Sequence, residues 1–147
     1  MALSATPLKL ISGWTWPMRV RRMLGLWAFA YVALHLTSYV VLDQFFDWRA
    51  IGMDIVKRTY ITVGMGAFII LATLAATSPK RVIKRLGGQA WKRIHKYIYI
   101  AGIMGCWHYY WMVKADTLPP LIHAAVLGVL LAIRLGYSYR PKKRLGS

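Results

Sequence analysis

The chain has 147 residues, 58% of them hydrophobic, and its 20 Lys and Arg residues against 4 Asp and Glu residues give a formal net charge of +16. A mean hydropathy of +0.43 is high for a soluble domain, and the long apolar runs favour a membrane protein over a nucleic-acid-binding protein. The single cysteine, Cys106, excludes an intrachain disulfide.

Four apolar stretches are long enough, or nearly so, to cross a hydrocarbon core of ~30 Å as helices. In chain order they cover residues 23–42, 60–78, about 97–113 and 118–135. The second stops at Pro79, which cannot continue a helix. The fourth begins at Pro119 and Pro120, in the first turn, where a helix tolerates proline. The sequence therefore predicts an all-α membrane protein built as a four-transmembrane-helix bundle.

The charges predict how this bundle is oriented. The N-terminal segment, the loop 79–96 and the end of the chain hold 16 of the 20 basic residues and no acid. The loops on the other side, 43–59 and 114–118, hold four basic and four acidic residues. By the positive-inside rule both termini of this multi-pass protein are cytoplasmic. We expect the basic loop to bind anionic membrane lipid, or alternatively to dock an acidic electron donor.

These assignments divide the chain into three parts. Residues 1–22 form a basic cytoplasmic segment, residues 23–138 form the four-helix transmembrane domain, and residues 139–147 form a basic cytoplasmic tail. All four histidines lie in or at the ends of the apolar stretches. An ionisable side chain at such depth is costly, and it indicates a functional site facing the bundle interior. The alternative is that each histidine only forms a hydrogen bond between helices.

His35 and His108 are the strongest candidates for a shared site. The first and third predicted helices run in the same direction, so depths along them can be compared directly. His35 lies 7 residues and His108 lies 5 residues before the outer end of its helix. Two imidazoles at one level, from two helices, are what a six-coordinate heme iron requires. With both axial positions filled, such a heme suits electron transfer.

A second, inner site is less completely specified. His95 lies 13 residues before His108, about 20 Å away along a helix. The position on the first helix at the equivalent depth is Arg21, 14 residues before His35. Arginine is a poor iron ligand but binds a heme propionate or a flavin phosphate well. The inner site is therefore either a second heme with unusual ligation or a site for another cofactor.

His123 and the glycines have more modest interpretations. His123 lies at about the depth of His108, and we favour a structural or propionate-binding role over iron ligation. Gly64 and Gly66 are interpreted as positions of close helix packing. Gly105, with Gly102, would let the helix bend or let a porphyrin approach the backbone.

Several segments of the chain resemble the MsrQ family, also called YedZ, within the ferric-reductase-like transmembrane superfamily. The resemblance spans roughly residues 6–134 and is carried by five motifs. They are Arg21-Arg22-Met-Leu-Gly-Leu-Trp, Leu34-His35-Leu-Thr-Ser-Tyr39, Lys57-Arg58-Thr-Tyr-Ile-Thr-Val-Gly64, Trp91-Lys-Arg-Ile-His95 and His108-Tyr-Tyr-Trp-Met-Val-Lys114. Family members usually have six helices, and Thr6-Pro7-Leu8 resembles the end of the second. We therefore expect the first two helices to be lacking, and any quinone or FMN site on them does not follow from the resemblance.

The resemblance implies heme b, with His35, His95 and His108 matching the family's histidines and Arg21 matching its arginine. It also implies bound FMN, and electrons from the quinone pool or a cytoplasmic flavin reductase. The electrons would pass to the periplasmic molybdopterin-containing partner MsrP, which itself reduces methionine sulfoxide. On this hypothesis the chain is an electron-transfer subunit without the substrate-reducing site.

Two alternatives remain open at this stage. One is a self-contained cytochrome b-type reductase that reduces ferric iron or a quinone directly. The other is a non-redox membrane anchor or small transporter in which the histidines only pack. A heme absorption band would eliminate the second alternative, and the identity of the electron acceptor would separate the first from an electron-transfer subunit.

Overall fold

The computed structural model describes residues 16–113 and 117–138, apart from the side chains of residues 16–21, 134, 137 and 138. Every regular element in these ranges is helical, as the sequence predicts. The longest are α2 (Trp16–Ser38), α4 (Thr59–Ala76), α7 (Ile98–Met112) and α8 (Leu118–Ser138). Each coincides with one of the four predicted apolar stretches.

The main difference at a helix boundary concerns α2. It begins at Trp16, so the predicted basic segment 1–22 supplies its first turns. Pro17 lies in the first turn, where its missing N–H costs no hydrogen bond. A hydropathy pattern does not mark this start, because Arg19, Arg21 and Arg22 interrupt the apolar run.

Three short helices lie in the segments that the sequence suggested were loops. They are α3 (Trp48–Lys57), α5 (Lys80–Leu86) and α6 (Gly88–Ile94). The side chain of Asp47 caps α3 by accepting hydrogen bonds from the backbone N–H groups of Arg49 and Ala50, both at 3.0 Å. Gly87 separates α5 from α6 with a φ of +77°, a conformation that favours glycine. A bundle of four helices alone is therefore too simple a description.

A π-helix extends α2. This element, η1 (Tyr39–Asp43), ends with an i to i+5 hydrogen bond in which the Gln44 N–H donates to the Tyr39 carbonyl at 3.0 Å. Just before it, the hydroxyls of Thr37 and Ser38 donate to carbonyls four residues earlier. Such back-bonding bends helices, and π-turns inside helices are frequent at functional sites.

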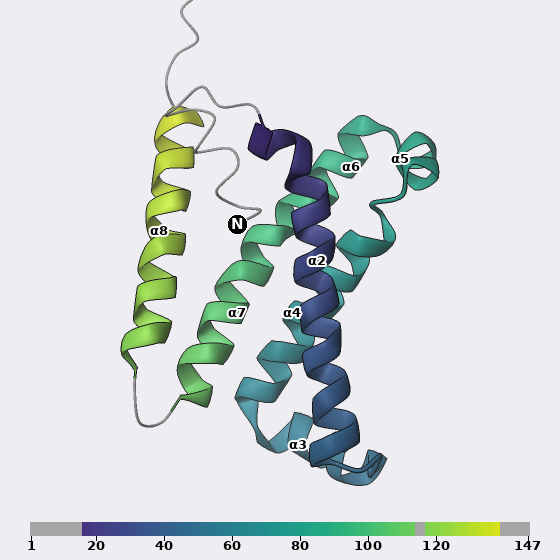
Figure 1. Ribbon diagram of the computed structural model, residues 1–147, viewed down its shortest axis with the longest axis vertical. Helices are drawn as coiled ribbons and strands as arrows, with labels where there is room; N and C mark the ends of the chain where they lie inside the picture. The colour runs from purple at the N-terminus through teal and green to yellow at the C-terminus, as the bar shows by residue number, and fades with distance from the viewer. Residues whose placement is uncertain (1–15, 114–116, 139–147) are drawn as a thin grey trace, which may run out of the picture.

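The helices are arranged with α4 between α2 and α7, while α8 packs on the far side of α7 (Figure 1). Ala67 of α4 and Ala101 of α7 are buried, and such small side chains let helices approach closely. By contrast, α2 and α7 make little direct contact within the described residues, although both pack against α4. This arrangement leaves space between α2 and α7.

The two ends of the molecule differ. Figure 1 shows α5 and α6 at the same end as the start of α2 and the end of α8. The helix α3 lies at the opposite end, between the C-terminal end of α2 and the N-terminal end of α4. We refer to these as the α5–α6 end and the α3 end. The basic stretch 79–96 thus lies at the end of the molecule where α2 begins and α8 ends.

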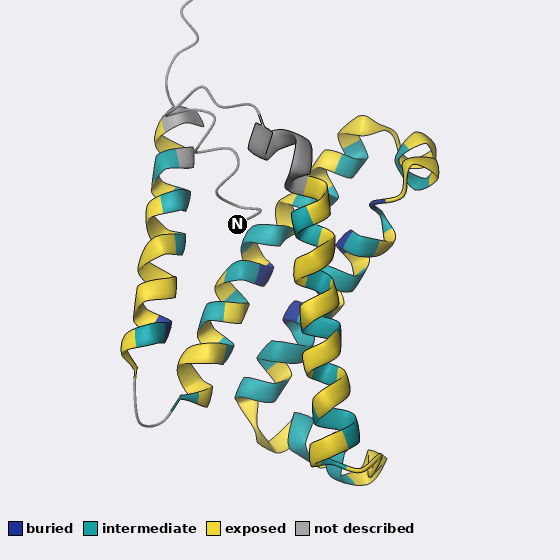
Figure 2. Ribbon diagram, viewed as in Figure 1, coloured by how far each residue is buried: buried dark blue, intermediate teal, exposed yellow. Residues whose placement is uncertain are grey.

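Much of each long helix is exposed (Figure 2), and many of the exposed residues are large and apolar. Examples are Tyr31 on α2, Ile69 on α4, Trp107 on α7 and Val129 on α8, each more than half exposed. Two described stretches, Arg22–Asp43 and Thr59–Ala76, are long and apolar enough to cross a membrane, and Leu118–Ile133 is apolar but shorter. Exposed apolar belts of this kind match a lipid surround.

Candidate functional site

A cavity of about 540 Å³ lies between α2, α4 and α7, within the usual size range of ligand sites. Its walls include Val32, Phe68, Leu71 and Ala101, which are apolar. Both His35 and His108 also line it. The cavity therefore occupies the space that separates α2 from α7.

The structure brings His35 of α2 and His108 of α7 together. Their ring centres are 6.3 Å apart and their planes are inclined by 72°. His108 is half-buried, and His35 is exposed. The expectation that two histidines from two parallel helices share one level is met by this geometry. Whether they ligate iron stays a prediction.

His108 is held in one orientation by a backbone group. Its Nδ1 lies 2.7 Å from the carbonyl oxygen of Tyr60, in the first turn of α4. Because a carbonyl can only accept, Nδ1 must carry the proton and donate it. The other ring nitrogen, Nε2, then keeps its lone pair. Metal-binding histidines commonly have this second hydrogen bond, which fixes their tautomer and their direction.

Two glycines shape the surroundings of His108. A Cβ atom on Gly64 would lie 2.8 Å from His108 Nδ1 and 2.9 Å from its Cε1. Gly64 is thus a position of close packing, as predicted, and its neighbour is the candidate ligand itself. Gly105, one turn before His108 on the same helix, lines the cavity, and a Cβ there would meet nothing within 4 Å. The cavity therefore reaches the backbone of α7 directly.

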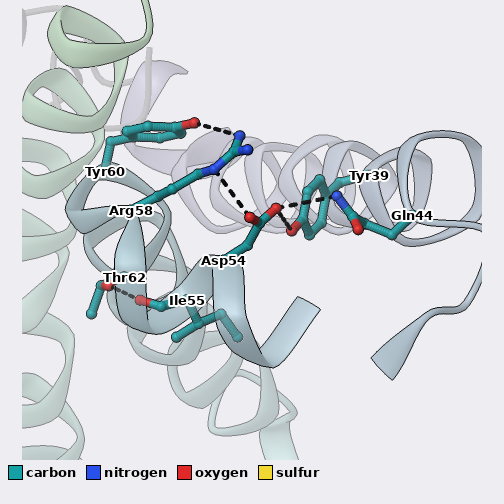
Figure 3. A network of polar contacts seen from close by, with 7 residues as sticks. All are labelled: Tyr39, Gln44, Asp54, Ile55, Arg58, Tyr60 and Thr62. Atoms are coloured by element: carbon teal, nitrogen blue, oxygen red, sulfur yellow. Dashed lines mark hydrogen bonds and ion pairs between the residues drawn. The ribbon is translucent and has the colours of Figure 1, made fainter. Parts of the chain in front are cut away.

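A polar network borders the cavity toward the α3 end (Figure 3). Asp54 accepts hydrogen bonds from the Tyr39 hydroxyl at 3.0 Å and the Gln44 amide at 3.2 Å, both at Oδ2. Its Oδ1 lies 3.0 Å from Nε of Arg58. Arg58 in turn donates from Nη1 to the Tyr60 hydroxyl at 3.1 Å.

The hydrogen bond to Tyr60 and the charge of Asp54 raise the pKa of Arg58 above its ordinary value. Arg58 therefore keeps its positive charge at any working pH. Nearby, the Thr62 hydroxyl donates to the Ile55 carbonyl, which ties α4 to α3. These contacts fix the corner between the two helices, and with it the Tyr60 carbonyl that orients His108.

The third predicted ligand, His95, lies elsewhere. It begins η2 (His95–Tyr97), a 3-10 turn between α6 and α7 at the α5–α6 end. Its ring stacks on Trp91 with a centre distance of 4.0 Å, and its Nδ1 lies 3.1 Å from the Trp91 carbonyl oxygen. His95 does not line the cavity between His35 and His108. Arg21 belongs to α2, but its side chain lies outside the described residues.

His123 is also outside this cavity. It is exposed on α8, its Nδ1 lies 2.7 Å from the Pro119 carbonyl oxygen in the preceding turn, and its ring meets Tyr109 edge-on at 5.8 Å. This placement agrees with the structural role that the sequence favoured. It connects α8 to α7.

The chemistry of the cavity fits a heme. Among the described residues, no group of three or more His, Cys, Asp or Glu side chains could hold a metal ion. Two imidazoles occupy two of the six positions of a six-coordinate iron, and the four nitrogens of a tetrapyrrole can fill the others. Metal-to-imidazole nitrogen bonds of about 2.0 Å on opposite sides place the two ring centres about 6 Å apart. The observed 6.3 Å agrees.

Sequence reasoning missed most of the surroundings of these histidines. The Tyr60 contact is made by a backbone carbonyl, which leaves no signal in the sequence. The pair Asp54 and Arg58 does have one, since opposite charges four residues apart are neighbours on a helix. Tyr39 and Gln44 reach Asp54 only because η1 follows α2, and a π-helix is not visible in a hydropathy pattern.

Comparisons with known proteins identify relatives. Residues 1–106 match the family model described as ferric reductase like transmembrane component. A protein-methionine-sulfoxide reductase heme-binding subunit MsrQ from Rhodospirillum rubrum is 56% identical over 142 residues, which cover 97% of this chain and 68% of that protein. Proteins with the same name from Herminiimonas arsenicoxydans and Azospira oryzae are 42% and 48% identical, over 98% and 92% of this chain.

These matches cover 67% of the Herminiimonas protein and 58% of the Azospira protein, so the chain spans roughly two thirds of the length of its relatives. No solved structure matches. The family model ends before His108, whereas the similarity to the relatives extends over nearly the whole chain. On this evidence the chain belongs to the ferric-reductase-like transmembrane family and, within it, to the MsrQ proteins.

Proposed function

We propose that the chain is the heme-bearing electron-transfer subunit of a methionine sulfoxide reductase system, with heme b held between His35 and His108. The observation that carries this proposal is the pair of imidazole rings 6.3 Å apart across an otherwise largely apolar cavity. The names of the relatives, each a heme-binding subunit of protein-methionine-sulfoxide reductase, support it independently.

Heme b bound here supplies one-electron redox chemistry. The chain would hold this group with one imidazole from His35 and one from His108, which would leave no position on the iron for a substrate. The Tyr60 carbonyl keeps Nδ1 of His108 protonated, which leaves the lone pair of Nε2 available to bind a metal. Residues such as Phe68 and Leu71 give the cavity apolar walls that suit the apolar body of a tetrapyrrole. A site built in this way relays electrons and performs no substrate reaction of its own.

We place the protein in the bacterial inner membrane, with four spanning helices and both termini cytoplasmic. The positive-inside rule supports this orientation, since the two terminal segments and the loop 79–96 hold 16 of the 20 basic residues of the sequence and no acid. His35 and His108 then lie in the periplasmic half. The acceptor on that side is the molybdopterin-containing methionine sulfoxide reductase subunit, and the donor is quinone or a cytoplasmic flavin reductase.

A second cofactor at the α5–α6 end completes the path. His95 lies at that end, stacked on Trp91, and Arg21 belongs to the part of α2 near the same end. Electrons entering from the cytoplasm need a relay there, because the outer site is about 20 Å further across. A second heme b is our first choice for this relay, and FMN is the second.

A self-contained ferric reductase is the other candidate, favoured by the description of the matching family model. Stopped-flow oxidation of the purified, chemically reduced protein separates the two. Our proposal predicts fast oxidation of the heme by the periplasmic molybdoenzyme and slow oxidation by ferric chelates. Equal rates with ferric chelates alone would favour the reductase. Absence of any heme absorption would exclude both.

A further inference from the structure

The cavity has one apolar end and one polar end. Val32, Ala67, Leu71 and Ala101 line it on the side of the α5–α6 end. Toward the α3 end its lining includes Ser38, Tyr39, Asp43, Gln44, Arg58 and Tyr60. A ligand with an apolar body and a charged edge is therefore expected to bind with that edge toward α3.

Arg58 determines the sign of the charge that this polar end accepts. It is the one Lys or Arg among the described residues that line the cavity. The acidic Asp43 also lines it, but the acid that contacts Arg58 is Asp54. Arg58 is about half exposed, with 54% of its side chain accessible, so its guanidinium remains within reach of a ligand.

The network leaves Arg58 able to bind a further anion. Only Nε and Nη1 are used in the contacts with Asp54 and Tyr60, so the guanidinium still has N–H groups to donate. Asp54 in turn does not depend on Arg58 alone, because Tyr39 and Gln44 both donate to it. The Tyr60 oxygen accepts from Arg58, and its own hydroxyl proton can be donated to a ligand.

We propose that Arg58, together with the Tyr60 hydroxyl, binds a carboxylate of the tetrapyrrole held between His35 and His108, which orients its propionates toward the α3 end. The planar guanidinium suits a carboxylate because it can donate two parallel hydrogen bonds. This inference rests on the proposed function and deepens it. It assigns to Arg58 a positioning role.

The test compares heme b with heme b dimethyl ester, whose carboxylates are blocked, in titrations of the heme-free protein in detergent. We expect Arg58→Gln to weaken heme b binding about tenfold to a hundredfold, the range for a charge-assisted hydrogen bond. The same variant should leave the affinity for the ester unchanged. Arg58→Lys should retain part of the affinity for heme b. Arg49→Gln, which removes an exposed cation of α3 that does not line the cavity, is the matched control.

A second background separates anion binding from a role in folding. Asp54→Asn removes the acid that Arg58 neutralises, so a purely structural Arg58 would become dispensable there. We expect Arg58→Gln to weaken heme b binding in the Asp54→Asn background as well. Equal losses for heme b and its ester, or no loss in that background, would overturn the inference and leave the histidine site intact.

A lipid phosphate is the other anion that Arg58 could bind. If Arg58→Gln reduced co-purifying phosphatidylglycerol without changing heme b affinity, the propionate assignment would be wrong. Failure of the unmodified chain to bind either heme b or the ester would instead overturn the proposed function itself.

Discussion

Alanine at position 64 would place a methyl group against the ring of His108. The Cβ atom would lie 2.8 Å from Nδ1 and 2.9 Å from Cε1, whereas ordinary contacts begin at 3.4 Å. The ring must therefore retreat by about 0.6 Å, the difference between 3.4 and 2.8 Å. The atom pressed most closely is Nδ1, which forms the 2.7 Å hydrogen bond with the Tyr60 carbonyl.

The cost of Gly64→Ala follows from these contacts. Overpacking of this kind costs ~1–3 kcal/mol, and loss of the Tyr60 hydrogen bond costs ~1 kcal/mol. Alanine returns ~1 kcal/mol through its better helix propensity. A net cost of ~1–3 kcal/mol that acts on the orientation of His108 lowers the fraction of His108 bound to iron about fivefold to 150-fold. We expect part of the heme to change from low spin to high spin.

Gly66→Ala is the matched control on the same helix. Its Cβ would meet Met104 at 2.6 Å, but the atom it meets is Cε, the free end of a flexible side chain that can rotate away. Electron paramagnetic resonance and the heme-to-protein ratio of the two purified variants provide the comparison. A Gly64→Ala spectrum identical to that of Gly66→Ala would refute the close contact between Gly64 and a coordinating His108.

Three further predictions concern the cavity, the orientation and the inner site. Gly105→Leu should fill the cavity and abolish heme binding while the helical circular dichroism is retained. Gly128→Leu is its control, since a Cβ there also meets nothing within 4 Å, and this variant should bind heme normally. Heme retained in Gly105→Leu would place the cofactor elsewhere. A reporter fused after Ser147 should be cytoplasmic and one inserted near Asp47 periplasmic, and the reverse pattern would invert the direction of electron flow. His95→Ala should lose about half of the heme, or slow the reduction of the outer heme by a cytoplasmic donor, and unchanged content with unchanged kinetics would make His95 an interfacial residue.

The long helices could be predicted because hydrophobic length is a direct physical requirement of a bilayer. The stretches that become α4 and α8 are bounded by charges and prolines, and their limits were nearly right. Parallel α2 and α7 made the depths of His35 and His108 comparable, which is why this pair could be found without a structure. Short helices were missed because α3, α5 and α6 are too short for a hydropathy signal.

The environment of His35 and His108 could not be predicted, because it depends on the register between helices. Nothing in the sequence says that the Tyr60 carbonyl faces His108, or that Gly64 lies against its ring. These contacts arise where α4 meets α7, and an isolated sequence does not specify which faces of two apolar helices meet. The capping side chain of Asp47, by contrast, is a local signal that could have indicated α3.

The most direct test of the central claim is the electron paramagnetic resonance spectrum of the ferric protein and of three histidine variants. The account predicts a low-spin, bis-imidazole signal that is lost or becomes high-spin in both His35→Ala and His108→Ala. His123→Ala, which alters a histidine outside the cavity, should retain the signal of the unmodified chain. A low-spin signal that survives in His35→Ala and in His108→Ala, with unchanged heme content, would contradict the assignment of these two side chains as the axial ligands.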